Sequence, residues 1–321
     1  MEPLTNGLHY TRVKRLASGI PVDYDTKFQL HSDQKLIIIS GIVPGSQAHQ
    51  IFLLSMQTGR IIKKILAHSA HINQILFLSG LNTIISCSND ATILVSKPFG
   101  RKKEIEPTRF NLRSKVYCIL AIQDESKGKN LVLCGGAFTG VWCTELQPKG
   151  SKKLILDSGK NVVMLHFLKN MLLCFNYQDS SIDCYEWNLK SRLMTVQGKL
   201  RYAILNSITP ITENLLFLHY EGHVAEILKI GADDTELIER SKKSFEAKGA
   251  IFSSGSGIIN VTDNNQIKSL KIIDCNEIEE ESQPMSLNPP MGVIPYCVSS
   301  INELVFIKTY QSEIAIFKLM K

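Results

Sequence analysis

Short apolar runs separated by turn residues fill this chain from end to end. Between residues 67 and 96 three such runs follow one another, at Ile72–Phe77, Ile84–Cys87 and from Thr92 onward. Gly, Asn, Asp and Ser stand between them. Runs of this length, rich in β-branched and aromatic residues and bounded by such turns, are typical of antiparallel strands. The pattern leaves little room for helices and predicts an all-β chain.

The strands fall into seven groups of similar length, which begin near residues 22, 67, 115, 161, 203, 250 and 293. Dividing 321 residues among seven groups gives about 46 each, close to the ~40–45 of a four-stranded propeller blade. The last group has only three strands, and the N-terminus supplies a spare one at Leu8–Leu16. If that strand pairs beside EIAIFKLM, the ring closes without an exposed edge.

The sequence therefore predicts a single domain over residues 1–321. We expect a seven-bladed β-propeller of four-stranded antiparallel blades, closed in its last blade by a strand within residues 1–20. The longest loop is expected at residues 277–292, where an acidic run and three prolines do not suit a central strand. That segment has two interpretations: a solvated strand end followed by a loop, or a loop that docks a partner.

Residues 67–96 resemble one WD repeat. His68, Ser88 and Asp90 match its Gly-His and Ser-x-Asp positions, whereas Ala67 and Ser96-Lys97 replace the Gly and the Trp-Asp. The chain thus resembles the divergent WD-repeat (WD40-like) β-propeller family. The resemblance implies a structural turn network in which His68, Ser88 and Asp90 are joined by hydrogen bonds, since a turn Asp accepts backbone N–H groups and a neutral His bridges it to a hydroxyl.

Catalytic and metal-binding motifs are missing from the sequence. There is no GxSxG elbow, HExxH helix or phosphate-binding glycine loop, and the eight Cys form no CxxC pair. We therefore expect no enzyme activity, metal, cofactor or small-molecule substrate. Most Cys lie in apolar runs, and neither a secretory signal nor a membrane-length apolar run occurs. These features predict a cytoplasmic or nuclear location, or both, and no membrane partner.

Four turns after second strands carry an aromatic residue. They are Phe138, Tyr177, Tyr220 and Tyr310. In a propeller these turns lie on the same face, so the four residues form a candidate partner-binding face. The alternative is that each ring covers the end of its own blade.

The net charge is +6 and basic residues occur in clusters. Arg101, Lys102, Lys103, Lys152 and Lys153 are candidate RNA contacts. The alternative interpretation is that these side chains are solvated strand edges that discourage further strand pairing.

The family resemblance implies a non-catalytic scaffold or adaptor subunit of a multi-subunit complex. Its partners would be other protein subunits, and an enzyme that it activates is one alternative. A second function stays open: an RNA-associated subunit of an RNA-processing, RNA-modification or ribonucleoprotein assembly. Because one fold hosts many functions, both functions are inferred by analogy.

Overall fold

The computed structural model describes most of the chain. The described residues are 9–17, 20, 26–31, 35–99, 107–124, 129–146, 152–168, 170–187, 191–197, 205–212, 214–220, 224–231, 239–240, 245–246, 249–252, 257–261, 266–274, 277–280, 285–286, 293–301, 304–309 and 313–320. Within these ranges the helical element is a short 3₁₀ helix, η1, at Ser79–Leu81. No helix in the described part is long and apolar enough to cross a membrane.

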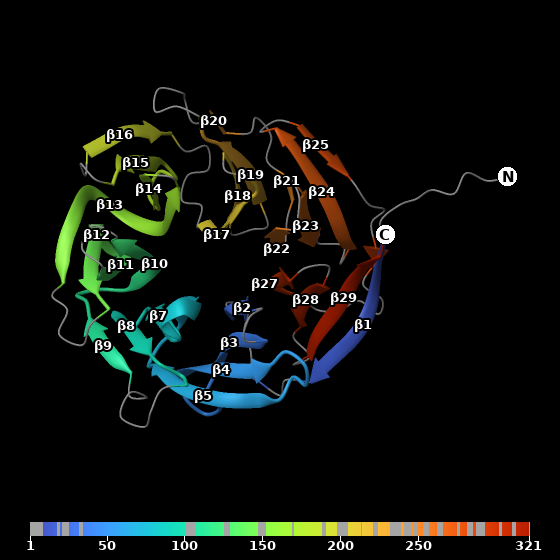
Figure 1. Cartoon of the computed structure of the whole chain (residues 1–321). Coiled ribbons are helices and arrows are strands. Elements are labelled where there is room, and N and C mark those ends of the chain that lie inside the picture. Colours follow the sequence, from blue (N-terminus) through green and yellow to red (C-terminus); the bar gives the residue numbers. More distant parts are fainter. Residues whose placement is uncertain are drawn as a thin grey trace. The chain divides into compact units, whose positions relative to one another are not determined.

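The strands form six sheets (Figure 1). One has the order β2-β3-β4-β5, with β2 at Phe28–His31, β3 at Leu36–Ile42, β4 at His49–Ser55 and β5 at Ile61–His68. The next has the order β6-β7-β8-β9, at Ile72–Leu78, Thr83–Ser88, Thr92–Ser96 and Thr108–Asn111. A seven-stranded sheet runs from β10 to β16, at Val116–Asp124, Lys129–Gly136, Phe138–Glu145, Lys153–Leu168, Met171–Asn176, Ile182–Glu186 and Ser191–Val196.

The other three sheets come from the C-terminal part and the N-terminal strand. One has the order β17-β18-β19-β20, at Leu205–Pro210, Leu215–Tyr220, Val224–Lys229 and Glu239–Arg240, and β21 at Phe245–Glu246 also pairs with β19. Another has the order β22-β23-β24-β25, at Gly249–Phe252, Gly257–Val261, Gln266–Asp274 and Glu277–Glu280, with β26 at Met285–Ser286 also on β24. The last has the order β1-β29-β28-β27, at His9–Ala17, Glu313–Met320, Leu304–Thr309 and Val293–Ile301.

The N-terminal strand pairs with the C-terminal strand as the sequence predicts. β1 lies antiparallel to β29, with His9 opposite Met320 and Ala17 opposite Glu313 (blue and red in Figure 1). A register shift between Arg12 and Lys14 marks a bulge in β1. The edge of β29 is thereby covered by a strand from the other end of the chain.

Strand β13 differs from expectation. The sequence predicts that a new group of strands begins near residue 161, but a single strand spans Lys153–Leu168 across that point. Gly159 has a φ of +67°, a backbone conformation that glycine adopts without steric cost. Up to Asn161, which lies opposite Thr139, β13 pairs with β12, and from Val162 onward it pairs with β14. The turn chemistry therefore marks a change of pairing partner inside a continuous strand.

The loop expected at residues 277–292 is shorter than predicted. Its first four residues form β25, which pairs with β24, and Met285–Ser286 form β26. The remaining residues of that segment lie outside the described ranges.

The chain divides into two compact units. The first unit comprises residues 1–41, 52–62 and 206–321, and the second comprises residues 42–51 and 63–205. In the first unit a buried cluster joins residues of β3 and β4 to β29. Its members are Ile20, Ile37, Ile39, Phe52, Leu54, Ile314 and Ile316.

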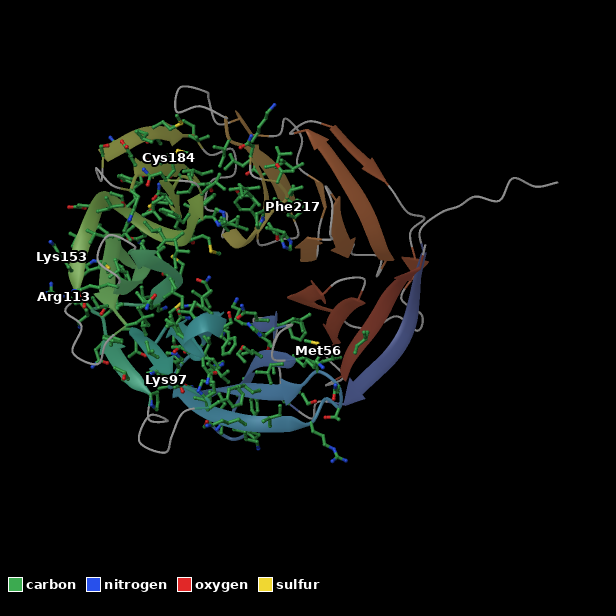
Figure 2. The ribbon with its side chains drawn as sticks, in the orientation of Figure 1. Met56, Lys97, Arg113, Lys153, Cys184 and Phe217 are labelled. Carbon is green, nitrogen blue, oxygen red and sulfur yellow. The ribbon has the colours of Figure 1, made fainter. Side chains whose placement is uncertain are left out.

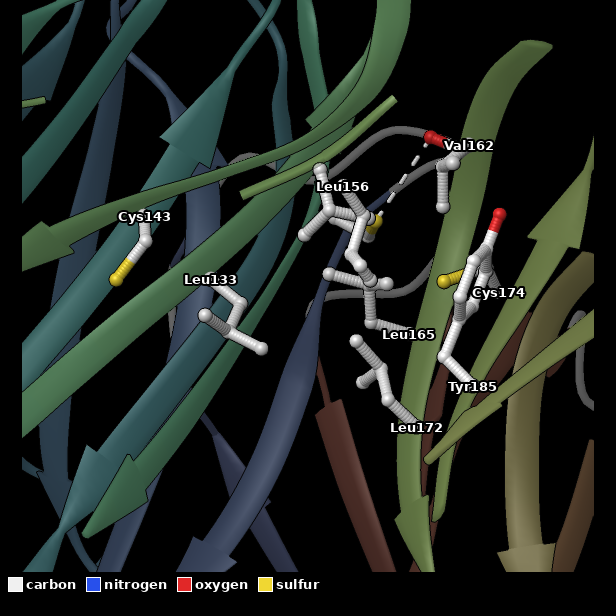
Figure 3. Close-up of a cluster of buried hydrophobic side chains, with 10 residues drawn as sticks. Leu133, Cys143, Leu156, Val162, Leu165, Leu172, Cys174 and Tyr185 are labelled. Atoms are coloured by element: carbon white, nitrogen blue, oxygen red, sulfur yellow. Dashed lines mark hydrogen bonds between the residues drawn. The ribbon is translucent and has the colours of Figure 1, made fainter. Parts of the chain in front are cut away.

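The sheet around β10–β12 in the second unit is buried on both faces. Leu133 and Cys143 belong to one apolar cluster, whereas Cys134 belongs to another (Figure 3). Leu133 and Cys134 are neighbours on β11, and alternate residues of a strand point to opposite faces. The two faces of β11 therefore pack in different apolar clusters. Gly135 and Gly136 permit this packing: a Cβ on Gly136 would lie 2.1 Å from the Lys115 carbonyl oxygen.

Candidate functional site

His68 is buried at the end of β5, where it joins three side chains of the second unit. Its Nδ1 lies 3.0 Å from Asp90 Oδ2 and 3.0 Å from Thr92 Oγ1. Its Nε2 lies 2.9 Å from Ser86 Oγ. A carboxylate only accepts, so Nδ1 carries a proton and donates it to Asp90. The ring therefore fastens the turn between β7 and β8 to the end of β5.

The Asp90 carboxylate accepts the hydrogen bonds that hold this turn. It accepts the N–H of Thr92 and the N–H of Ser69, both at 3.0 Å, and the Thr92 hydroxyl at 2.6 Å. Arg109 Nη1 lies 3.6 Å away on the exposed side. Burial opposes ionisation, but the hydrogen bonds from His68 and Thr92 prevail and hold the pKa of Asp90 well below its usual range.

Ser88 does not occupy the place that the sequence assigns to it. The hydroxyl against His68 is that of Ser86, whereas Ser88 donates to the Ala70 carbonyl and accepts the Asp90 N–H, each at 3.1 Å. Residues 86 and 88 share a face of β7 because strand side chains alternate. The His68 imidazole contacts the Ser86 hydroxyl, whereas the Ser88 hydroxyl accepts the Asp90 N–H in the turn. All three predicted residues thus take part in hydrogen bonds of this turn, but the hydroxyl partner of His68 is Ser86 and not Ser88.

Ser86, His68 and Asp90 have the connectivity of a hydrolase relay, with Ser Oγ on one ring nitrogen and Asp on the other. Their burial argues against that chemistry. Ser86 is 1% exposed and His68 is 2% exposed, so a substrate carbonyl cannot approach the hydroxyl. The relay stabilises the turn instead.

A second turn, between β14 and β15, repeats this arrangement with a lysine. Lys160 Nζ lies 2.9 Å from Asp179 Oδ2 and 2.9 Å from Ser181 Oγ. Asp179 accepts the Ser181 N–H at 3.0 Å, as Asp90 accepts that of Thr92. This turn contains no His, so the WD-repeat pattern does not reveal it in the sequence. The available signal is the shared Asp-x-[Ser/Thr]-Ile pattern at the two turns.

Asp183 is a buried carboxylate near the Lys160 ammonium of the second turn. The residue is fully buried on β15, and its carboxylate accepts hydrogen bonds from Asn176 Nδ2 at 2.8 Å and Thr195 Oγ1 at 2.6 Å. The Lys160 ammonium lies 3.9 Å from it. A buried carboxylate is tolerated when donors surround it in this way.

The four aromatic turn residues have different surroundings. Phe138 and Tyr177 are half-buried in the second unit. Tyr220, in the first unit, is 2% exposed, which contradicts its assignment to a binding face. It is the last residue of β18, and all six residues of that strand are buried. Tyr310 lies outside the described residues.

Tyr117 is an aromatic neighbour that the sequence analysis misses. Burial, and to a lesser extent the nearby Tyr177 hydroxyl, raise the pKa of the Tyr117 phenol. The exposed Lys115 precedes it by two residues, and the Lys115 carbonyl accepts the Ala137 N–H at 2.9 Å. Tyr117, Tyr177, Phe138 and Lys115 thus form what we call the aromatic–basic surface of the second unit.

The candidate RNA contacts are only partly described. Lys152 and Lys153 are exposed, and the Lys152 ammonium donates to the Asn111 carbonyl (Lys153 is labelled in Figure 2). Arg101, Lys102 and Lys103 lie outside the described residues.

Nothing in the described part of the chain groups three or more His, Cys, Asp or Glu as a metal site. Cysteines 87, 118, 134, 143, 174 and 184 are buried, and no disulfide joins any of these six. Burial raises the pKa of Cys118 and of Cys184 to about 12, so these thiols stay protonated at neutral pH.

Comparison with known proteins identifies the fold. No protein-family model matches the sequence, and no curated protein matches it. Among solved structures, the chain is similar to the β-propeller domain of Cps50 (Swd1) from Myceliophteria thermophila. The TM-score is 0.69 and the identity 11%, over 97% of this chain and 100% of that one. The chain therefore has a β-propeller fold, and the predicted resemblance is confirmed at the level of the fold.

Proposed function

We propose that this β-propeller is a non-catalytic scaffold or adaptor that binds other protein subunits. The main support is that His68, Ser86 and Asp90, whose connectivity resembles a catalytic relay, are buried and engaged in holding a turn. Such turns keep the backbone rigid. The side chains left at the surface are then presented with little loss of conformational entropy on binding.

We also propose that the propeller has seven blades and that β1 closes it. Five of the six sheets have the size of single blades. The seven-stranded sheet divides at β13, whose two ends pair with different strands. Deleting residues 1–17 is expected to lower the melting temperature and promote aggregation, because the β29 edge is then exposed. Unchanged melting and solubility would contradict closure by β1.

The aromatic–basic surface is the proposed contact region on the second unit. Half-buried aromatic rings bury large areas at low entropic cost, and the exposed Lys115, two residues before Tyr117, adds positive charge. We therefore expect partners that present apolar and acidic groups. An enzyme that the propeller positions or activates is one such partner.

The test is purification of the native complex from its source with an affinity tag. Tyr177→Ser combined with Lys115→Glu is expected to reduce co-purifying subunits at least tenfold. Lys153→Glu, an exposed change on β13, is the matched control. Thermal melting must show that all three proteins are folded. If the double variant co-purifies with the same subunits as the unmodified protein, this surface is not the contact region. If the unmodified protein co-purifies with no subunits, the proposed function is wrong.

An RNA-associated role is the second candidate, supported by the exposure of Lys152 and Lys153. Binding through phosphate contacts weakens steeply with salt. If the role is correct, single-stranded RNA binds at low salt and Lys152→Glu with Lys153→Glu weakens that binding. Absence of binding at low salt would exclude it. We further propose a cytoplasmic or nuclear location, supported by six buried cysteines of the described part that are not in disulfides.

A further inference from the structure

Two neighbouring hollows on the second unit form a continuous groove. One, of about 340 Å³, is lined by residues from β6, η1, β10 and β11. The other, of about 190 Å³, is lined by residues from β7, β8, β11 and β12. Leu81, Asn130 and Leu146 line both hollows. We call this surface the Leu81 groove.

The lining of the Leu81 groove combines apolar and polar residues, and the groove is open. Phe77, Ala121 and Ile122 line it together with Leu81, whose side chain is 39% exposed. A Cβ built on Gly80 would meet nothing within 4 Å, so the space above η1 is empty. Drug-sized ligands usually occupy enclosed pockets of about 300–1,000 Å³. A shallow, elongated surface suits the side chains of an extended peptide better.

The charge of the groove is positive. Lys97, labelled in Figure 2, is exposed and forms no ion pair with any residue that the structure describes. The other cation in the lining, Lys129, pairs with Glu145 at 2.7 Å. Among the described residues the Lys97 ammonium is therefore the excess charge of this lining, and it favours a carboxylate beside Leu81 and Leu146.

We infer that the Leu81 groove binds an extended acidic peptide segment of a protein partner. A leucine-like side chain of that segment packs on Leu81 and Leu146, and a neighbouring carboxylate meets Lys97. The inference rests on the proposed function as a protein-binding platform, but it uses a different surface from the aromatic–basic one. RNA fits less well, because the lining offers two lysines, one of them paired with Glu145, and therefore few phosphate contacts.

The test uses four synthetic peptides of equal length in a Gly-Ser host. They carry Leu with Asp, Leu with Asn, Leu with Lys, and Ala with Asp. Binding to the full chain is followed by fluorescence anisotropy. The Leu–Asp peptide is expected to bind at least tenfold more tightly than the Leu–Lys peptide and several-fold more tightly than the other two.

Variants locate the binding in the groove. Gly80→Trp is expected to abolish it by filling the empty space, whereas Gly80→Ala leaves it unchanged. Lys97→Glu is expected to reverse the preference, so that the Leu–Lys peptide binds better than Leu–Asp. Leu81→Asp weakens binding at least tenfold, and Leu193→Asp, at a side chain exposed to a similar 40%, does not. Melting curves verify that each variant is folded.

Several outcomes would overturn the inference. These are failure of every peptide to bind, binding that survives Gly80→Trp, and an Asp preference that persists in Lys97→Glu. Sedimentation gives a further such outcome. If the protein self-associates and Leu81→Asp abolishes this association, the groove is occupied by a second copy of this chain. None of these results affects the Tyr177 and Lys115 test, so failure here is distinguishable from failure of the proposed function.

Discussion

The turn between β7 and β8 and the turn between β14 and β15 hold an aspartate with the same backbone geometry but different donors. Asp90 and Asp179 each accept the N–H of the residue two positions later at 3.0 Å. The intervening residue has a positive φ in both turns, +64° at Ala91 and +52° at Ser180. A histidine donates to the first aspartate and a lysine to the second.

Burial explains the choice of donor. The His68 and Asp90 side chains are 0% and 5% exposed, whereas those of Lys160 and Asp179 are 29% and 41% exposed. The buried imidazole has a partner on each ring nitrogen, Asp90 on Nδ1 and Ser86 on Nε2, so its polar atoms are satisfied in a dry site. An ammonium needs water or several acceptors, and Lys160 has both solvent access and a second carboxylate, Asp183. The same turn geometry is thus compatible with two electrostatic arrangements.

The largest effect is expected when the buried carboxylate is removed. Asp90→Ala leaves His68 Nδ1 and two backbone N–H groups without their acceptor, which we expect to cost about 3 kcal/mol of unfolding free energy. Urea denaturation measures it. Asp157→Ala is the control, because that exposed residue accepts the Gly159 N–H in a solvated turn. A similar cost for both variants would show that Asp90 does not stabilise the fold in this way.

Exchanging the two donors tests the burial argument directly. His68→Lys places an ammonium in a dry site and is expected to cost about 2–3 kcal/mol. Lys160→His keeps a donor at a half-exposed site and is expected to cost about 1 kcal/mol or less. Unfolding free energies of the two single variants give the comparison. Equal costs would mean that burial does not determine the donor.

The sequence predicts the strands of both turns but only one of the networks. Apolar runs bounded by Ser-Asn-Asp and Tyr-Gln-Asp place β7, β8, β14 and β15 correctly. Lys160 is missed because a lysine in a sequence is usually solvated, and only the fold brings it to Asp179. Tyr220 is misassigned because β18 is buried on both faces and shows no alternation that would reveal its surroundings.

Replacing Ser86 or Ser88 is expected to cost less unfolding free energy, and the two residues should differ in their coupling to His68. Ser86→Ala removes the hydroxyl partner of His68 Nε2 and is expected to cost about 1.5 kcal/mol. Ser88→Ala is expected to cost about 1 kcal/mol through the lost turn contacts. A double-mutant cycle with His68→Ala should give a coupling of about 1 kcal/mol for Ser86 and near zero for Ser88. The reverse order of couplings would restore the sequence-based assignment.

The smallest effect is the pH dependence of the exposed turn. Burial opposes ionisation of Asp179, but hydrogen bonds from Ser181 and Lys160 lower its pKa from 3.8 to about 2. A depressed folded-state pKa stabilises the fold above pH 3.8, and this stabilisation disappears as the pH falls through about 2. Solvent screening keeps it below about 1 kcal/mol. The difference in unfolding free energy between the unmodified protein and Asp179→Asn should therefore be constant from pH 7 to 5 and shrink as the pH falls below 4. A difference that stays constant down to pH 3 would show that the Lys160 contact does not favour the ionised carboxylate, and the likeness between the two turns would then be geometric only.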